Sequence, residues 1–399
     1  MAGNGEILSL TGLRFIAALY VFLFHIQIRW PITNIPFLKN ILDQGATGMS
    51  VFFMLSGFLL AYRYVNADNS LKDYLVNRFA RIYPVYIVVA ITTLPWLGID
   101  FFADKTEDLI FKMAQALLLV MSNIFLIQAW FPQFFSYWND GGSWSISVEV
   151  FCYLLLPFIL PRLALLSLKN VFLVAVLCWV FAILPGLSFK LFSGPSFAVF
   201  YAMPIFRFPE FLLGVCVFLF LRKAPDVRCY FIFSIIVPLI VLIYLGYFGP
   251  VMPIYVGHNW LILPAVGLML SALACGKGPV SALLATTTFV WLGKISYCFY
   301  SFQVVMILML MSHYDKLVAA LPVFANGKLL AASAFMILVV LSAVGYYLIE
   351  EPARYWIRHK YKKRKLKLKK QQQLRLLNEG VLGGSRCATD TTGPKFKSS

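Results

Sequence analysis

The chain contains repeated runs of about 20 apolar residues, and these runs constrain its fold more than any other feature. A helix of that length crosses the hydrocarbon core of a bilayer, whereas a membrane β-strand alternates over about 10 residues. With 61% hydrophobic and only 13% charged residues, the chain lacks the polar residues to cover a water-exposed surface. We therefore predict an all-α fold, a polytopic transmembrane helical bundle. The apolar segments are 10–29, 46–65, 82–99, 109–130, 145–160, 171–189, 203–221, 230–248, 259–275, 289–312 and 327–349.

Charges in the connecting segments indicate which of these runs cross the membrane, because Lys and Arg accumulate in cytoplasmic loops. Segment 109–130 follows an acidic stretch and precedes residues 131–143, which contain no Lys or Arg, so both flanks favour the exterior. We expect about ten crossings plus one re-entrant or tilted segment at 109–130, with both termini cytoplasmic. The basic residues that define the cytoplasmic loops are Arg63, Lys72, Arg78, Arg81, Arg162, Lys169, Arg222, Lys223, Arg228 and Lys277.

Most of the net charge of +17 lies at the C-terminal end, where residues 360–399 hold twelve Lys or Arg against two acidic residues. A polybasic segment directly after a span favours contact with the lipid bilayer, so we expect no nucleic-acid partner. We divide the chain into a transmembrane domain at 1–358 and a basic cytoplasmic tail at 359–399, with disorder expected beyond Gln371. The N-terminus lacks the basic region and cleavage site of a signal peptide, which predicts that the first span is retained.

The cysteines have no CxxC spacing. They predict neither a metal site nor a disulfide framework.

Two ionisable residues, Arg14 and His25, lie in the first apolar segment. At about 100° per residue they share one helix face, about 16 Å apart along the axis. Ionisable residues inside a span are costly and are usually retained for function. A buried histidine is often only a structural hydrogen-bonding group, but a neutral imidazole can also accept a proton from a hydroxyl group. We consider His25 the best candidate for a general base, with Arg14 on the same polar path.

The segment Asn77-Arg-Phe-Ala-Arg-Ile-Tyr-Pro84 places Arg78 and Arg81 one helical turn apart before the third span, next to Tyr83. The two guanidinium groups have two interpretations. They can anchor the cytoplasmic side of the bundle, or they can bind phosphate groups at a helix entrance. Ser56 precedes Gly57 in the second span, where small residues favour close helix packing.

The fifth span begins Trp144-Ser-Ile-Ser-Val-Glu149, so Ser145 and Glu149 share a helix face. An unpaired carboxylate at this depth is costly. Glu149 can pair with Arg14, pair with Arg207, or remain protonated. The aromatic residues around Trp144 form either an interfacial belt or a platform for stacking sugars.

In the seventh span Arg207 precedes Glu210 by three residues. This spacing fits a local ion pair, and it equally fits a pair of substrate-binding groups.

Taken in order, these segments resemble the acyltransferase 3 family, integral-membrane enzymes best known for O-acetylating bacterial surface polysaccharides. The similarity covers most of residues 6–358. It depends on Arg14 with His25, residues 51–58, 78–84, 144–149, 207–214 and 293–297, and the sequence Glu350-Glu-Pro352.

The resemblance implies an O-acetyltransferase of the bacterial inner membrane. It would take acyl-CoA from the cytoplasm as its donor substrate and transfer the acyl group to a hydroxyl of a polysaccharide or lipid-linked glycan at the outer side. Arg14 and His25 would be essential, and Arg78 and Arg81 would approach the CoA phosphates. We place Tyr83 and Ser56 with the acyl-CoA site, and Trp144, Ser145, Arg207 and Glu210 with the acceptor. One departure is Gln303, where family members often carry a histidine.

We expect direct transfer, in which His25 deprotonates the acceptor hydroxyl as it attacks the thioester, while Glu149 orients the site or balances its charge. An acyl-histidine intermediate is the variant of this scheme. The alternative from another class is a transporter or flippase for a glycan or an acyl-bearing substrate, because intramembrane Arg, His and Glu also mark transport pathways.

Overall fold

The computed structural model describes residues 5–67, 70–99, 106–138, 140–192, 197–224, 231–252 and 255–386. Within these ranges the regular elements are helices and no strand is present, which confirms the all-α prediction. Ten helical segments are long and apolar enough to cross a membrane. The helices of these segments are α1 (Leu8–Gln27), α3 (Gly48–Tyr64), α4 (Leu71–Thr92), α6 (Asp140–Leu165), α7 (Leu168–Phe192), α9 (Pro204–Lys223), α10 (Phe233–Phe248), α11 (Asn259–Ala274), α13 (Thr287–Ala320) and α14 (Gly327–Gly345).

Shorter helices connect the long ones. They are α2 (Pro36–Asp43), α5 (Thr106–Ile124), α8 (Phe197–Ala202), α12 (Pro279–Leu284) and the single turns η1 (Gly45–Thr47), η2 (Leu94–Trp96), η3 (Gln128–Trp130), η4 (Pro132–Phe134), η5 (Gly249–Val251), η6 (Tyr255–His258) and η7 (Pro322–Ala325). The apolar part of α5, Leu109–Ile124, is too short to count among the ten spans. This agrees with the prediction that ten of the eleven apolar segments cross.

Helix α4 begins eleven residues before the segment that hydropathy predicts. Its first turns carry charged and polar side chains, so a sliding average misses them. Ser70 starts the helix with a capping box, in which its hydroxyl accepts from the Asp73 N–H and the Asp73 carboxylate accepts from the Ser70 N–H. Arg78 and Arg81 therefore lie two turns or more inside α4, and the prediction that they sit at a helix entrance is wrong.

Glycines bring four helices of the core into close contact. A Cβ on Gly57 of α3 would collide with the Phe211 carbonyl oxygen, and one on Gly214 of α9 would collide with the Met54 carbonyl oxygen. Gly293 of α13 meets α1 in the same way, against the Thr11 carbonyl oxygen. Small residues are the usual means of close helix approach in membranes. The prediction that small residues at Ser56 and Gly57 allow close helix packing is thus confirmed for Gly57.

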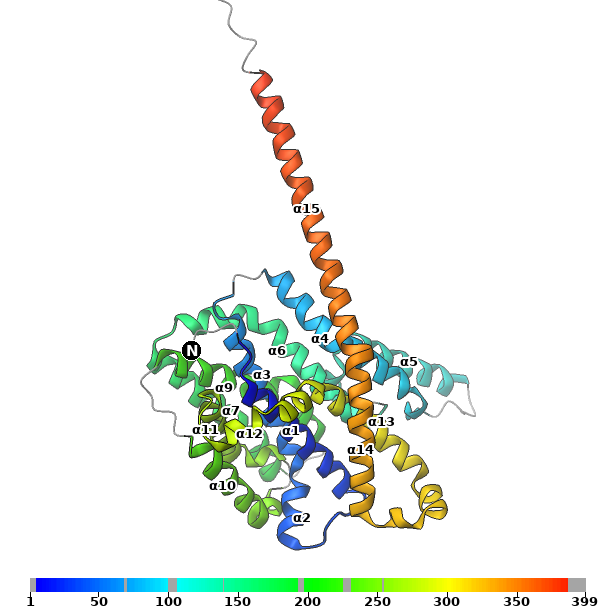
Figure 1. Cartoon of the computed structure of the whole chain (residues 1–399). Helices are drawn as coiled ribbons and strands as arrows, with labels where there is room; N and C mark the ends of the chain where they lie inside the picture. The colour runs from blue at the N-terminus through cyan, green and yellow to red at the C-terminus, as the bar shows by residue number, and fades with distance from the viewer. Residues whose placement is uncertain are drawn as a thin grey trace, which may run out of the picture.

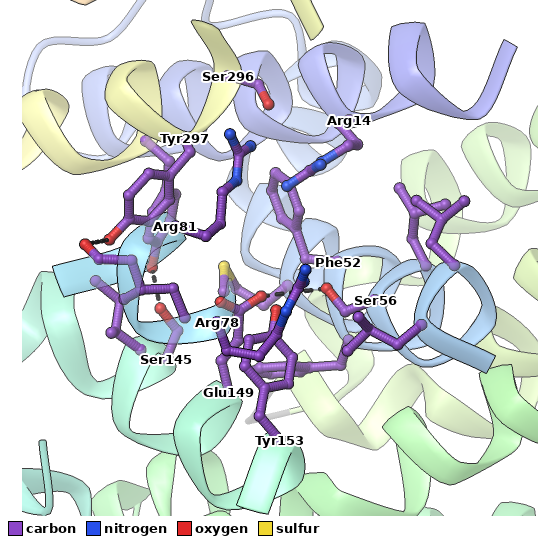
Figure 2. Close-up of a pocket in the computed structure, with 18 residues that line it drawn as sticks. Arg14, Phe52, Ser56, Arg78, Arg81, Ser145, Glu149, Tyr153, Ser296 and Tyr297 are labelled. Atoms are coloured by element: carbon purple, nitrogen blue, oxygen red, sulfur yellow. Dashed lines mark hydrogen bonds between the residues drawn. The ribbon is translucent and has the colours of Figure 1, made fainter. Parts of the chain in front are cut away.

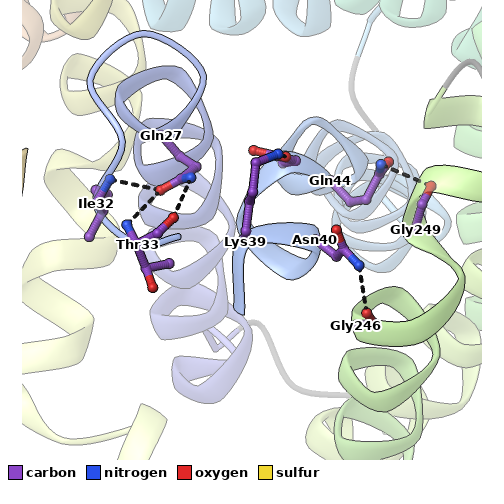
Figure 3. Close-up of polar contacts among 9 residues, drawn as sticks. Gln27, Ile32, Thr33, Lys39, Asn40, Gln44, Gly246 and Gly249 are labelled. Atoms are coloured by element: carbon purple, nitrogen blue, oxygen red, sulfur yellow. Dashed lines mark hydrogen bonds and ion pairs between the residues drawn. The ribbon is translucent and has the colours of Figure 1, made fainter. Parts of the chain in front are cut away.

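The end of α1 and the helix α2 lie at one end of the bundle (Figure 1). Gln27 closes the turn after α1, because its side-chain oxygen accepts from the Ile32 N–H at 2.8 Å. Asn40 of α2 and Gln44, the residue that follows α2, donate to the carbonyl oxygens of Gly246 and Gly249, at 2.8 and 3.0 Å (Figure 3). These contacts fasten α2 to the end of α10.

A continuous helical segment leaves the opposite end of the bundle (Figure 1). Helix α14 passes through the π-helical turn η8 (Tyr346–Glu350) into α15 (Glu351–Arg386). Although we expect disorder beyond Gln371, the structure continues α15 as far as Arg386, and the Gln, Leu and Arg residues at 372–377 are good helix formers. Residues 387–399 lie outside the described part of the chain.

One cysteine differs from the sequence prediction. Cys275, which follows α11, is disulfide-bonded, although no disulfide framework is predicted. Cys152, Cys178, Cys216 and Cys298 are free and buried.

Candidate functional site

A cavity of about 100 Å³ lies among α1, α3, α4, α6 and α13 (Figure 2). It brings together six of the residues singled out from the sequence, namely Arg14, Ser56, Arg78, Arg81, Ser145 and Glu149. Residues far apart in the chain therefore share one polar space inside an apolar bundle. The polar lining residues for which the sequence predicts no role are Tyr153 of α6 and Ser296, Tyr297 and Tyr300 of α13.

Glu149 is held by Ser56 and interacts electrostatically with Arg14. The Ser56 hydroxyl donates to the Glu149 carboxylate at 3.1 Å, and the charge of Arg14 acts on the same carboxylate. Arg14 makes no ion pair within 4 Å among the described residues, so its guanidinium remains available in the cavity. Neither of the two ion pairs considered for Glu149, with Arg14 or with Arg207, is formed within 4 Å in the part of the chain that the structure describes.

Arg78 and Arg81 differ in how they are held, although one turn separates them. Arg81 forms an ion pair with Glu350 and lies over the ring of Tyr297, 5.8 Å from its centre. Arg78 lies over the rings of Tyr64 and Tyr153, at 5.6 and 5.8 Å, and donates to the Tyr64 hydroxyl at 3.4 Å. The Arg78 Nε atom is buried and has no hydrogen-bond partner in the described structure. Arg78 thus has spare donor capacity, whereas the charge of Arg81 is already balanced.

Glu350 is the most prominent charged group near the cavity that the sequence analysis did not assign. It is fully buried at the end of the π-helical turn, where it also accepts from the Cys298 thiol at 3.3 Å and lies 3.6 Å from Arg354. A π-helical turn within a longer helix is often found at functional sites. An acidic residue at the end of an apolar segment is the signal that could have found it.

Ser145 and Tyr300 close another side of the cavity. Their hydroxyl groups are 2.7 Å apart, and the Tyr300 hydroxyl donates to the Gly142 carbonyl oxygen at 3.1 Å. Tyr83 lies elsewhere, stacked on Phe79 with its hydroxyl near the Ile124 carbonyl oxygen. The structure therefore does not bring Tyr83 to the cavity with Ser56, Arg78 and Arg81.

Arg207, Glu210 and Trp144 form a separate buried group that does not line the cavity. Arg207 pairs with Glu210 at 2.6 Å, and Asn259 donates to the same carboxylate at 2.8 Å. This arrangement confirms the predicted local ion pair. The rings that surround the Arg207 guanidinium are Phe53, Trp144 and Tyr201, with centres at 5.1, 5.6 and 5.5 Å. Trp144 is buried inside the bundle, so the predicted interfacial belt does not describe its position.

His25 lies on α1 toward the end of the bundle that carries α2, outside the cavity lining. Its Nδ1 atom is 3.4 Å from an Arg29 nitrogen, and its ring lies 5.0 Å from the ring of Phe24. The cavity and His25 are thus distinct places along the same helix. Among the described residues, no cluster of three or more His, Cys, Asp or Glu side chains is arranged to hold a metal ion.

The fold and the cavity define a polytopic membrane protein with a charged internal site. Residues 7–349 match the family described as an acyltransferase domain, and the chain therefore belongs to this acyltransferase 3 family.

Three relatives illustrate the similarity. The chain is 29% identical to the acyltransferase MdmB of Streptomyces mycarofaciens, over 54% of this chain and 57% of that protein. It is 25% identical to a putative O-acetyltransferase of Staphylococcus aureus (strain COL), over 87% of this chain and 57% of that protein. It is 28% identical to an O-acetyl transferase of Shigella phage Sf6, over 36% of this chain and 43% of that protein. The matched regions thus span 57% of the length of the first two relatives. No solved structure matches the chain.

Proposed function

We propose that the protein is a membrane O-acyltransferase that moves an acetyl or other small acyl group from acyl-CoA to a hydroxyl of a surface polysaccharide or lipid-linked glycan. The observation that carries the proposal is the cavity, which holds Arg14, Ser56 and Glu149 inside an apolar bundle of the acyltransferase family. Names of the relatives, acyltransferase and O-acetyltransferase, support the same reaction.

The cavity is a small polar space along the path that the acyl donor would take. Its volume of about 100 Å³ is less than the ~150 Å³ of an engineered protein cavity that binds benzene. Arg14 lies about 16 Å along α1 from His25, so its unpaired guanidinium would line the path of the acyl donor toward His25 and would not contact the reacting carbonyl. Glu149, fixed by Ser56, would balance the charge of Arg14.

The proposed reaction is a single displacement. A nitrogen of the His25 imidazole takes the proton of the acceptor hydroxyl, and the oxygen attacks the thioester carbonyl carbon. The new C–O bond forms as the C–S bond breaks, and the proton passes to the CoA thiolate. Because His25 lies toward the α2 end and Arg78 toward the α15 end, donor and acceptor would approach from opposite ends of the bundle. The donor side would be the cytoplasm of a bacterial inner membrane.

Labelled acetyl-CoA, offered to the purified protein with an extract of surface glycans, tests the proposal. The unaltered protein should form a labelled glycan ester, and His25→Ala should slow the reaction by about 10²–10⁴-fold, the usual contribution of a general base. His313→Ala, at an exposed histidine, is the matched control. Labelled protein in the absence of acceptor would indicate an acyl-histidine intermediate. Movement of label into proteoliposomes without a new ester would overturn the proposal in favour of transport.

A further inference from the structure

A cluster of arginines lies where α15 packs against α4, beyond the cavity lining on the side of Arg78. Arg63 of α3, Arg78 of α4 and Arg354 of α15 are all close enough to Arg358 of α15 to interact with it electrostatically. The Lys365–Asp73 ion pair, at 2.6 Å, holds α15 against α4, and the Arg81–Glu350 pair joins α4 to η8, the turn from which α15 continues. The cluster is therefore fixed by the packing of two helices.

The cluster has more positive charge than its acidic neighbours can balance. In the described residues its only ion pair is between Arg354 and Glu350, at 3.6 Å, and the same carboxylate already pairs with Arg81. The Nε atoms of both Arg78 and Arg358 are buried without a hydrogen-bond partner. Buried donors are normally satisfied, so two unpaired guanidinium donors in one cluster indicate an anionic ligand.

We infer that Arg63, Arg78, Arg354 and Arg358 form a phosphate-binding site that α15 completes. This inference builds on the proposed function, because the phosphates of a coenzyme A donor would occupy it. The inference makes α15 part of the donor site. It excludes Arg81 from the phosphate ligands, because the Arg81 guanidinium is paired with Glu350. Guanidinium groups suit this task because their planar donors bind phosphate oxygens in pairs.

The surroundings have room for a group attached to the phosphate. Tyr64, which accepts from Arg78, also lines a second cavity of about 230 Å³ between α3, α4 and α6. Tyr74 lines the same cavity, and its hydroxyl group is buried without a partner. Two sources can supply the phosphate, namely coenzyme A and the headgroup of an anionic lipid, and the test distinguishes them.

The test compares Arg358→Gln with Lys363→Gln, an exposed residue on the opposite face of the same helix, which loses the same charge. The full chain is placed in phosphatidylcholine nanodiscs, and coenzyme A binding is measured by calorimetry. Arg358→Gln should weaken binding by about tenfold, the effect of losing one charged hydrogen-bonding group. Lys363→Gln should bind as the unaltered chain does.

Thermal unfolding without ligand separates a binding role from a structural one. Arg358→Gln should raise the unfolding temperature slightly, because it removes repulsion among like charges. A residue needed only for packing would lower it. Arg358→Lys keeps the charge and should recover part of the coenzyme A affinity, but not the paired hydrogen bonds.

The second arm measures retention of phosphatidylglycerol by native mass spectrometry. Normal coenzyme A binding with lower lipid retention in Arg358→Gln would support the phosphate site and identify the lipid as its source. If Arg358→Gln changes neither, or if the unaltered chain binds neither ligand, the inference is overturned. If the unaltered chain transfers acyl groups and Arg358→Gln binds both ligands normally, the phosphate-site inference is overturned but the proposed function stands. If coenzyme A binding depends on Arg358 but the unaltered chain transfers no acyl group, the proposed function is overturned and the phosphate site stands.

Discussion

Glu350 balances the charge of Arg81 inside the bundle, and this role can be tested at the level of one residue. The carboxylate is fully buried and the Arg81 side chain is 17% exposed, so little water can replace a lost partner. Breaking a buried pair from one side leaves an uncompensated charge. We therefore expect Glu350→Gln to lower the free energy of unfolding by on the order of 3 kcal/mol, read as a lower unfolding temperature in detergent.

Glu351 provides the matched control, because it follows Glu350 directly but is exposed. Glu351→Gln should leave the unfolding temperature close to that of the unaltered protein. Equal unfolding temperatures for the two variants would show that the Arg81–Glu350 pair contributes nothing to stability.

At the scale of the helices, the contact between α3 and α9 depends on glycine at two facing positions. The groups that meet Gly57 and Gly214 are backbone carbonyl oxygens, which cannot rotate away as a side chain can. Gly57→Ala or Gly214→Ala should separate the two helices and cost about 1–3 kcal/mol, as overpacking does in protein cores. The measurement is the yield and unfolding temperature of folded protein after size-exclusion chromatography.

Gly267→Ala in α11 is the control for this helix contact. A Cβ there would lie 3.3 Å from a methyl group of Val217, a side chain that can yield by a few tenths of an ångström. This variant should fold nearly normally. Normal yields of Gly57→Ala and Gly214→Ala would mean that α3 and α9 tolerate a wider separation than the structure indicates.

At the scale of the whole molecule, the sequence predicts the number of spans well because the length of an apolar run is a local property. The length of an apolar run does not predict the charged start of α4, which is shown by its capping box and by its ion pair with α15. The residues of the site likewise fall into those that the sequence predicts and those that only the folded structure reveals. Arg14 and Glu149 can be predicted from the sequence, because charged residues are rare within apolar segments. The different partners of Arg78 and Arg81 follow from tertiary packing. Glu350 reaches Arg81 only after the chain has crossed the bundle several more times.

The even number of apolar helices makes a prediction about the termini. Ten crossings return the chain to the side on which it began. The apolar part of α5 covers only roughly 24 Å at 1.5 Å per residue, less than the ~30 Å of the hydrocarbon core. With the basic α15 inside, the connection at 131–138 would be outside and the α3–α4 connection inside.

Reporter fusions in a bacterial host test this arrangement. Green fluorescent protein after residue 386 should fluoresce, and alkaline phosphatase at that point should be inactive, because both results require a cytoplasmic position. Phosphatase inserted in 131–138 should be active, and phosphatase between α3 and α4 should not. If α5 crossed the membrane, the number of crossings would be odd and the two termini would lie on opposite sides. Phosphatase activity at the C-terminal position, with the α3–α4 insertion still inactive, would therefore show that α5 is a span.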